Sequence, residues 1–175
     1  SSINHVGFIL LGIMSYELMS EGTIFFYLII YLITTFGIFA VILNLRSSHG
    51  ELTKISELNG LRFRSRSQSI SMLVFLFSLA GIPPFAGFFA KFFILSASIN
   101  EGLYILSVIA VVSSVIAAFY YLSVIKNMFF NDKDNDLLLD NNKIGSFVFI
   151  SSALILTLFF FYPDPLINLV DGLFS

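Results

Sequence analysis

The chain has 175 residues, of which 57% are hydrophobic and 11% are charged, and its mean hydropathy is +0.93. So little polar surface excludes a soluble globular protein of this size and predicts an integral membrane protein. A formal net charge of −2 argues against nucleic acid as a partner. Because the sequence contains no cysteine, we expect no disulfide, thiolate metal site or iron–sulfur cluster on it.

Five apolar segments are each long enough to cross a hydrocarbon core about 30 Å thick as a helix. They span residues 3–19, 23–45, 70–99, 103–129 and 144–162. Every basic residue except Lys91 falls between 46 and 68 or between 126 and 143. If each segment crosses once, both stretches lie on one side, which the positive-inside rule makes the cytoplasm or the matrix of an organelle with bacterial topology. We therefore expect five crossings, with the amino end inside and the carboxyl end outside.

The third segment is interrupted near its middle by two adjacent prolines. Pro83 and Pro84 lack backbone N–H groups, and the Pro83 ring clashes with a helical carbonyl four residues earlier, so the first half should end near Gly81. Irregular backbone at membrane depth is tolerated only where protein or trapped water satisfies the freed carbonyls. We expect a discontinuous helix broken at Gly81–Pro84, with Gly87 also belonging to the break.

Lys91 is the one formally charged residue in the middle of an apolar segment. A charge at that depth costs about 2.5–3.5 kcal/mol on insertion scales, which predicts a polar partner and a role as a proton relay. The terminal carbonyls of the first half-helix carry the negative end of its dipole and are the expected partners. The alternative is a lysine that snorkels to the membrane surface and anchors a helix end.

The first segment contributes two further candidates. His5 is suited to proton relay, although a lone histidine in an apolar helix also serves as a hydrogen-bonded packing residue. Glu17 either lines an exit path for protons or is an interfacial charge. Small and hydroxyl residues elsewhere are expected to permit close helix packing, and their hydroxyls are candidates for holding water beside Lys91. These residues are Thr34, Thr35, Gly37, Ser113 and Ser114.

Two loops carry weaker signals. Between residues 51 and 61, leucine or isoleucine recurs at every third position, which predicts an amphipathic helix on the inner surface that Gly60 ends, or else a solvated loop. The loop at 131–142 holds four aspartates in a spacing superficially like a calcium loop. It lacks the glycine at the sixth position and the glutamate at the twelfth, so we interpret it as a solvated connector.

Three stretches of sequence together resemble one known family. They are SSINHVGF at 1–8, SLAGIPPFAGFFAKF at 78–92 and SSVIAAFYYL at 113–122, and YPDPL at 162–166 adds to them. The stretches are similar to the closing part of the chain 2 family of respiratory NADH:ubiquinone oxidoreductase (complex I), whose bacterial counterpart is subunit N. The family is antiporter-like and pumps protons, and the resemblance covers nearly the whole chain.

The resemblance implies an all-α membrane protein that forms part of an inverted-repeat antiporter-like bundle. Within it, Lys91 matches the family lysine at the outward half of the proton path, and His5 matches a histidine of the preceding hydrophilic axis. The family has a discontinuous helix in each of two repeats, whereas this sequence has one break. We therefore expect a single membrane domain over 1–175 that is a fragment of a larger subunit.

The resemblance also implies a function in H⁺-translocating NADH:ubiquinone reductase of the inner mitochondrial membrane, with a bacterial plasma membrane as the alternative. No cofactor is expected on this chain, because NADH, FMN, iron–sulfur clusters and ubiquinone belong to other subunits. Expected partners are an N-terminal companion fragment, neighbouring antiporter-like and small membrane subunits, and lipids. Two alternatives stay open: a subunit of a multi-subunit cation/proton antiporter, and a purely structural membrane subunit whose lysine is only a buried ion pair.

Overall fold

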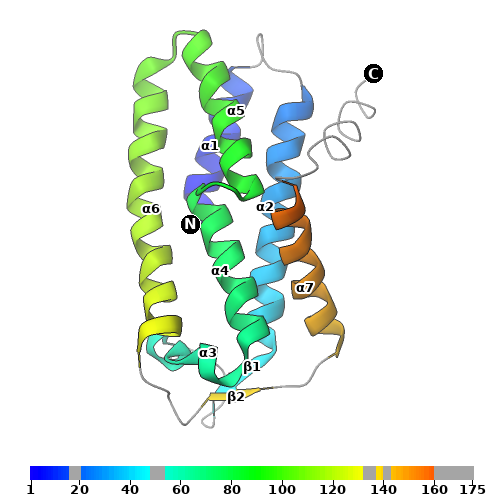
Figure 1. Ribbon diagram of the computed structural model, residues 1–175. Coiled ribbons are helices and arrows are strands. Elements are labelled where there is room, and N and C mark those ends of the chain that lie inside the picture. Colours follow the sequence, from blue (N-terminus) through cyan, green and yellow to red (C-terminus); the bar gives the residue numbers. More distant parts are fainter. Residues whose placement is uncertain (16–20, 48–53, 132–136, 140–142, 160–175) are drawn as a thin grey trace.

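The computed structural model describes residues 1–15, 21–47, 54–131, 137–139 and 143–159. Six helices of 13 or more residues make up most of this described part and form one bundle (Figure 1). They are α1 (Ser2–Met14), α2 (Glu21–Leu43), α4 (Arg66–Ala80), α5 (Ala86–Asn100), α6 (Tyr104–Phe130) and α7 (Lys143–Leu158). The predicted all-α class is confirmed for these residues.

The strands among the described residues are one short pair at one end of the bundle (Figure 1). β1 (Leu45–Ser47) pairs antiparallel with β2 (Leu137–Leu139), so that Leu45 lies opposite Leu139. The pairing supplies hydrogen-bond partners to backbone N–H and C=O groups that lie outside the helices. The partners are about ninety residues apart, and the sequence did not predict this contact.

Two helical stretches, Gly22–Leu43 and Tyr104–Phe130, are by length and composition able to cross a membrane alone. The other four long helices have between 13 and 16 residues each. Of these, α4 and α5 follow one another along the bundle beside the single long helix α6 (Figure 1). The number of crossings therefore stays a prediction.

The predicted amphipathic helix at 51–61 does not form in its described residues. Ile55–Leu58 is a single 3₁₀ helix, Gly60 adopts a left-handed φ of 65°, and a separate short helix, α3 (Leu61–Arg64), begins after it. The reason is visible in the spacing, since leucine or isoleucine at every third position matches the three-residue turn of a 3₁₀ helix better than the α period. The Gly60 N–H donates to the carbonyl of Asn127, which holds this connector under α6.

Helix α2 packs against α1, α4, α5 and α7. Gly37 permits the close approach of α4, because a Cβ at this position would overlap the buried ring of Phe75. Gly145 does the same for α7, where a Cβ would meet the Asn44 side chain. The prediction that Gly37 permits close packing is thus confirmed.

By contrast, α6 is buried on one face only. It exposes a continuous row of large apolar side chains that includes Ile105, Val108, Val112, Val115 and Phe119. Contact between such an apolar surface and water is unfavourable, so this face is suited to contact lipid or another membrane protein.

Candidate functional site

The site is built around the junction of α4 and α5. Gly81 ends α4 in the left-handed region with a φ of 79°, and its N–H donates to the carbonyls of Phe77 and Ser78. The Ile82 N–H also donates to the Phe77 carbonyl, which closes the helix end. Pro83 and Pro84 follow, and α5 begins at Ala86. Both prolines are exposed, so the polar side of the junction is formed by the carbonyls before them.

The two helices overlap at this junction instead of being simply joined. The Gly87 N–H, which has no acceptor within the first turn of α5, donates to the Ser78 hydroxyl at 3.2 Å. A Cβ at Gly87 would overlap the Ser78 backbone carbonyl. A glycine at 87 therefore lets the first turn of α5 rest against the last turn of α4.

Lys91 lies one turn into α5 and is only 6% exposed. Its ammonium group donates to the Leu79 carbonyl at 2.8 Å, to the Ala80 carbonyl at 3.4 Å and to the Ser114 hydroxyl of α6 at 3.2 Å. The two carbonyls belong to the negative end of the α4 dipole, and an ammonium has three N–H bonds to donate. This geometry contradicts the snorkelling alternative, and no carboxylate pairs with Lys91 within the described part of the chain.

His5 is buried on α1, and two tyrosines of α2 contact its ring. Its Nδ1 lies 2.8 Å from the Tyr27 hydroxyl, and its ring stacks on Tyr31 with the centroids 4.7 Å apart and the planes at 25°. The other ring nitrogen, Nε2, is buried and has no hydrogen-bond partner among the described residues. Figure 1 places the amino end of α1 near the level of the α4–α5 junction.

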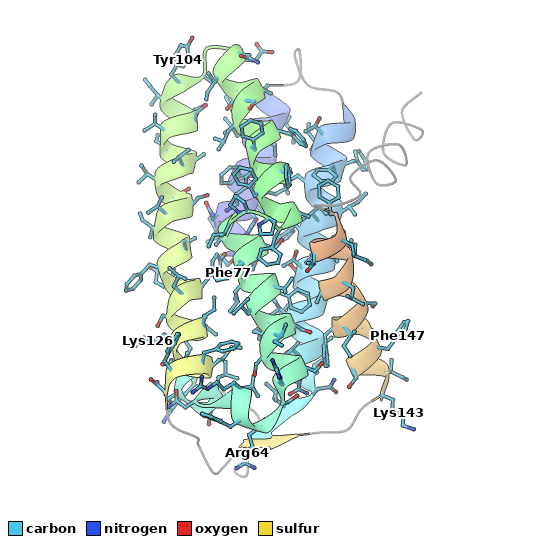
Figure 2. The ribbon with its side chains drawn as sticks, in the orientation of Figure 1. Arg64, Phe77, Tyr104, Lys126, Lys143 and Phe147 are labelled. Atoms are coloured by element: carbon cyan, nitrogen blue, oxygen red, sulfur yellow. The ribbon has the colours of Figure 1, made fainter. Side chains whose placement is uncertain are left out.

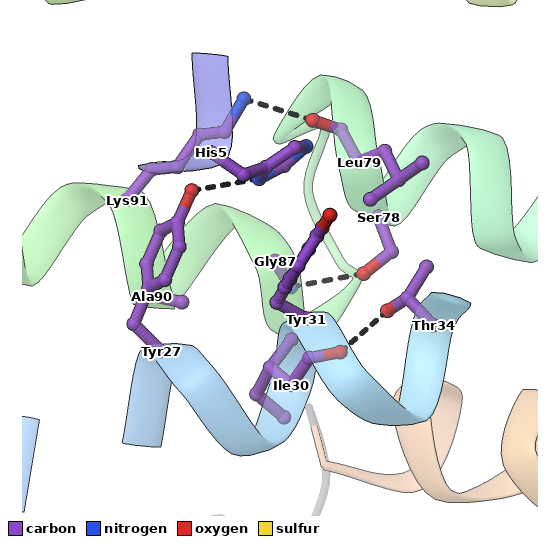
Figure 3. A pocket seen from close by; sticks show the side chains of 10 residues that line it. All are labelled: His5, Tyr27, Ile30, Tyr31, Thr34, Ser78, Leu79, Gly87, Ala90 and Lys91. Carbon is purple, nitrogen blue, oxygen red and sulfur yellow. Dashed lines mark hydrogen bonds between the residues drawn. The ribbon is translucent and has the colours of Figure 1, made fainter. Parts of the chain in front are cut away.

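A small cavity of about 10 Å³ joins these groups (Figure 3). It brings together His5 and Lys91, which are 86 positions apart in the sequence. Its lining is completed by Tyr27, Ile30, Tyr31, Thr34, Ser78, Leu79, Gly87 and Ala90. The volume is at the lower limit of the space that one water molecule needs, and the lining includes the polar side chains of His5, Tyr31 and Lys91.

A second cavity lies on the other side of Lys91, between α5 and α6. It has a volume of about 210 Å³ and is lined by Gly81, Lys91 and Ser114 together with apolar side chains. Lys91 is therefore the residue shared by a small cavity facing His5 and a larger cavity facing α6. A protonatable amine in this position can exchange a proton with either side.

The remaining sequence candidates have different outcomes. Ser114 contacts Lys91, whereas the Ser113 hydroxyl donates to the Asn4 side chain at 2.8 Å and ties α6 to α1. Thr34 lines the small cavity, but its hydroxyl donates to the Ile30 carbonyl of its own helix. Glu17 lies outside the described residues, so its role stays a prediction.

Sequence reasoning missed Tyr27 and Tyr31, which surround His5. The available signal was their spacing, because residues four apart in a predicted helix share one face, and a tyrosine can place a hydroxyl inside an apolar bundle.

Comparison with known proteins gives consistent matches over this chain. Residues 1–117 match the family described as NADH:quinone oxidoreductase/Mrp antiporter, transmembrane. The NADH-quinone oxidoreductase subunit N of Rhodospirillum rubrum is 40% identical over 168 residues, which is 96% of this chain and 34% of that protein. The subunit N of Pelagibacter ubique is 38% identical over 173 residues, which is 98% of this chain and 36% of that protein.

A solved structure matches the fold. A chain of respiratory complex I from Thermus thermophilus with bound aureothin superposes with a TM-score of 0.80 and 22% sequence identity, covering 94% of this chain and 37% of that one. This chain spans about a third of the length of the curated relatives it matches.

Proposed function

We propose that this chain, which belongs to the NADH:quinone oxidoreductase/Mrp antiporter transmembrane family, is a proton-translocating part of a membrane-arm subunit of respiratory complex I. Electron transfer from NADH to quinone on other subunits would drive protonation and deprotonation of Lys91. The observation that carries the proposal is the position of the Lys91 amine, which is buried, bonded only to neutral oxygens in the described residues, and shared by two cavities.

The proton route follows from these two cavities. A proton arrives from the His5 side through the small cavity and is held on the Lys91 amine, where the Leu79 and Ala80 carbonyls stabilise the positive charge. It leaves through the larger cavity beside Ser114. None of the three acceptors carries a negative charge that would hold the proton on the amine. Lys91 can therefore release its proton and become neutral.

The proposed arrangement in the membrane has five membrane segments, in which α4 and α5 act together as one discontinuous crossing and the described part of α1 starts near the level of their junction. The described basic residues support the orientation, since Arg64, Lys126 and Lys143 lie at the end of the bundle opposite Tyr104 (Figure 2). That end would face the matrix of a mitochondrion, or the cytoplasm if the membrane is bacterial.

The proposed partners follow from the share of the relatives that this chain covers. A companion fragment would supply the remaining two thirds of a subunit N. Neighbouring complex I subunits and lipids would cover the exposed apolar row of α6. NADH, FMN, iron–sulfur clusters and quinone would bind other subunits.

A second candidate is a subunit of a cation/proton antiporter, because the description of the matching family also includes Mrp antiporters. The subunit N relatives favour the complex I assignment. In the antiporter, the same lysine would exchange protons against a cation gradient instead of an electron-transfer reaction.

The test is Lys91→Met in membranes that contain the assembled protein. Methionine has a similar length and no proton to exchange, so we expect NADH-driven proton translocation to be lost. The control is Lys126→Met, which removes an exposed lysine at the end of α6 and should leave translocation unchanged. Loss of cation exchange without any effect on NADH-driven pumping would favour the antiporter, and unchanged activity in both assays would leave only a structural role for Lys91.

A further inference from the structure

We infer that Tyr27 is a positioning residue that keeps His5 in the neutral tautomer with its proton on Nε2. His5 then presents a donor, and not an acceptor, to the cavity that it shares with Lys91. Under the proposed function, a resting His5 in this tautomer offers no base to a proton that leaves Lys91 through this cavity. The inference rests on that function for its consequence, whereas the tautomer itself is independent of it.

The first step concerns the direction of the hydrogen bond between Tyr27 and His5. Tyr27 is 2% exposed, and the His5 Nδ1 at 2.8 Å is the one partner of its hydroxyl within the described residues. A buried O–H group without an acceptor is strongly disfavoured, so the hydroxyl donates to Nδ1. A ring nitrogen that accepts a hydrogen bond carries no proton, and the neutral ring must then carry its proton on Nε2.

The second step concerns the orientation of both rings. His5 stacks on Tyr31, and Phe8, one turn along α1, stacks on Tyr27 with the planes at 13°. Phe8 and Tyr27 are almost completely buried. These contacts fix the imidazole between two tyrosines, and Figure 3 shows its second nitrogen pointing away from Tyr27. In this orientation Nδ1, and not Nε2, is the ring nitrogen within hydrogen-bond distance of the Tyr27 hydroxyl.

The third step concerns what lies at Nε2. This nitrogen is buried without a partner in the described residues, and His5 lines the cavity that has room for one water. An Nε2–H group donates to such a water and cannot accept a proton from it. Lys91 lines the same cavity, so a proton leaving its ammonium toward this water finds no base at His5.

His5 gains a proton only in a second arrangement. Nδ1 is the ring nitrogen that carries no proton. Its protonation requires the Tyr27 hydroxyl to turn, so that its oxygen accepts a hydrogen bond from the new N–H group. The Tyr27 hydrogen must then point where the described residues offer it no acceptor. The hydroxyl of Tyr27 therefore opposes the protonation of His5, and the histidine stays neutral at rest.

The chain offers a matched pair of variants. Tyr27→Phe removes the hydroxyl that bonds Nδ1 and keeps the ring. Tyr31→Phe removes a hydroxyl four residues along the same helix, and the ring that stacks on His5 remains. Both changes delete one oxygen from the lining of the same cavity, so any difference between them reports the bond to Nδ1.

The first measurement is the ¹⁵N spectrum of His5 in the full chain in lipid bilayers, with the chains that co-purify with it. Only this chain carries ¹⁵N-histidine, and His49→Gln removes its other histidine. We expect a bare Nδ1 and a protonated Nε2 in the parent and in Tyr31→Phe. In Tyr27→Phe the tautomer ratio should change by up to about tenfold, the factor that one neutral hydrogen bond supplies. A proton on Nδ1 in the parent, or an unchanged ratio in Tyr27→Phe, overturns the inference, and the parent spectrum decides the matter even if the variant does not assemble.

The second measurement is the number of protons translocated per NADH, together with the passive proton leak. Tyr27→Phe should lower the ratio and raise the leak without slowing NADH oxidation, whereas Tyr31→Phe should match the parent. A proportional loss of NADH oxidation and proton pumping, with an unchanged number of protons per NADH, refutes this role of Tyr27. If Lys91→Met leaves pumping intact while the ¹⁵N spectra are as expected, the proposed function fails and the tautomer assignment stands.

Discussion

The overlap of the two half-helices makes Gly87→Ala the most direct structural test of the site. The added methyl group would overlap the Ser78 carbonyl, which is backbone and cannot rotate aside as a flexible side chain does. Relief requires the first turn of α5 to move away from α4. This movement weakens the hydrogen bond from the Gly87 N–H to the Ser78 hydroxyl.

The magnitude follows from three contributions. Overpacking costs about 1–3 kcal/mol, and loss of the hydrogen bond costs about 0.5–1.5 kcal/mol. The higher helix propensity of alanine offsets up to about 1 kcal/mol of this. We expect a net loss of about 1–3 kcal/mol in the free energy of unfolding, and a fall of several degrees in the midpoint of thermal inactivation.

Gly7→Ala is the matched control for this prediction. Gly7 lies inside α1, and apart from its two chain neighbours and the backbone of its own helix no described atom lies within 4 Å of the position that its Cβ would take. The substitution should leave the inactivation midpoint unchanged or raise it, because alanine favours the helix. Since Lys91 lies one turn after Gly87, Gly87→Ala should also reduce coupled proton translocation. A Gly87→Ala variant as stable and as well coupled as Gly7→Ala would refute the overlap.

Two further substitutions test the packing and the charge of the site. Gly37→Ala places a methyl group into the ring of Phe75 and should destabilise the chain by about 1–3 kcal/mol, measured by the midpoint of thermal inactivation, and Phe75→Leu in the same chain should restore part of the loss. Ser114→Asp places a carboxylate near the Lys91 amine and should hold it in the charged form, so that coupled proton translocation falls at least about tenfold. Ser114→Asn adds the same bulk without the charge, and an equal loss in both variants would show that size alone is responsible.

The junction of α4 and α5 could be predicted from the sequence because its causes are local. A glycine suited to a left-handed φ followed by two prolines ends a helix whatever surrounds it, and α4 does end at Ala80. The partners of Lys91 also follow from local chemistry. A buried ammonium just after a helix end requires oxygen atoms, and the nearest are the unpaired carbonyls of that end.

The surroundings of His5 could not be predicted in the same way, because they depend on how α1 approaches α2. Tyr27 and Tyr31 are ordinary members of an apolar segment until the His5 ring lies between them. The pairing of Leu45 with Leu139 is another contact between distant segments that no local pattern indicates. At 55–61 the apolar residues recur with a period of three, which predicts the 3₁₀ helix at Ile55–Leu58 better than an α-helix.

The kind of oxygen that holds Lys91 determines what the site can do. A carboxylate would stabilise the ammonium strongly, since two unit charges 4 Å apart attract by about 4 kcal/mol at an effective dielectric constant of 20, and release of the proton would have to overcome that energy. Carbonyl and hydroxyl dipoles provide less stabilisation, and they also tolerate the neutral amine. In the described part of the chain Lys91 has two carbonyls and one hydroxyl. A helix broken inside the bundle supplies such carbonyls without adding a second charge, which explains why the break and the lysine occur together.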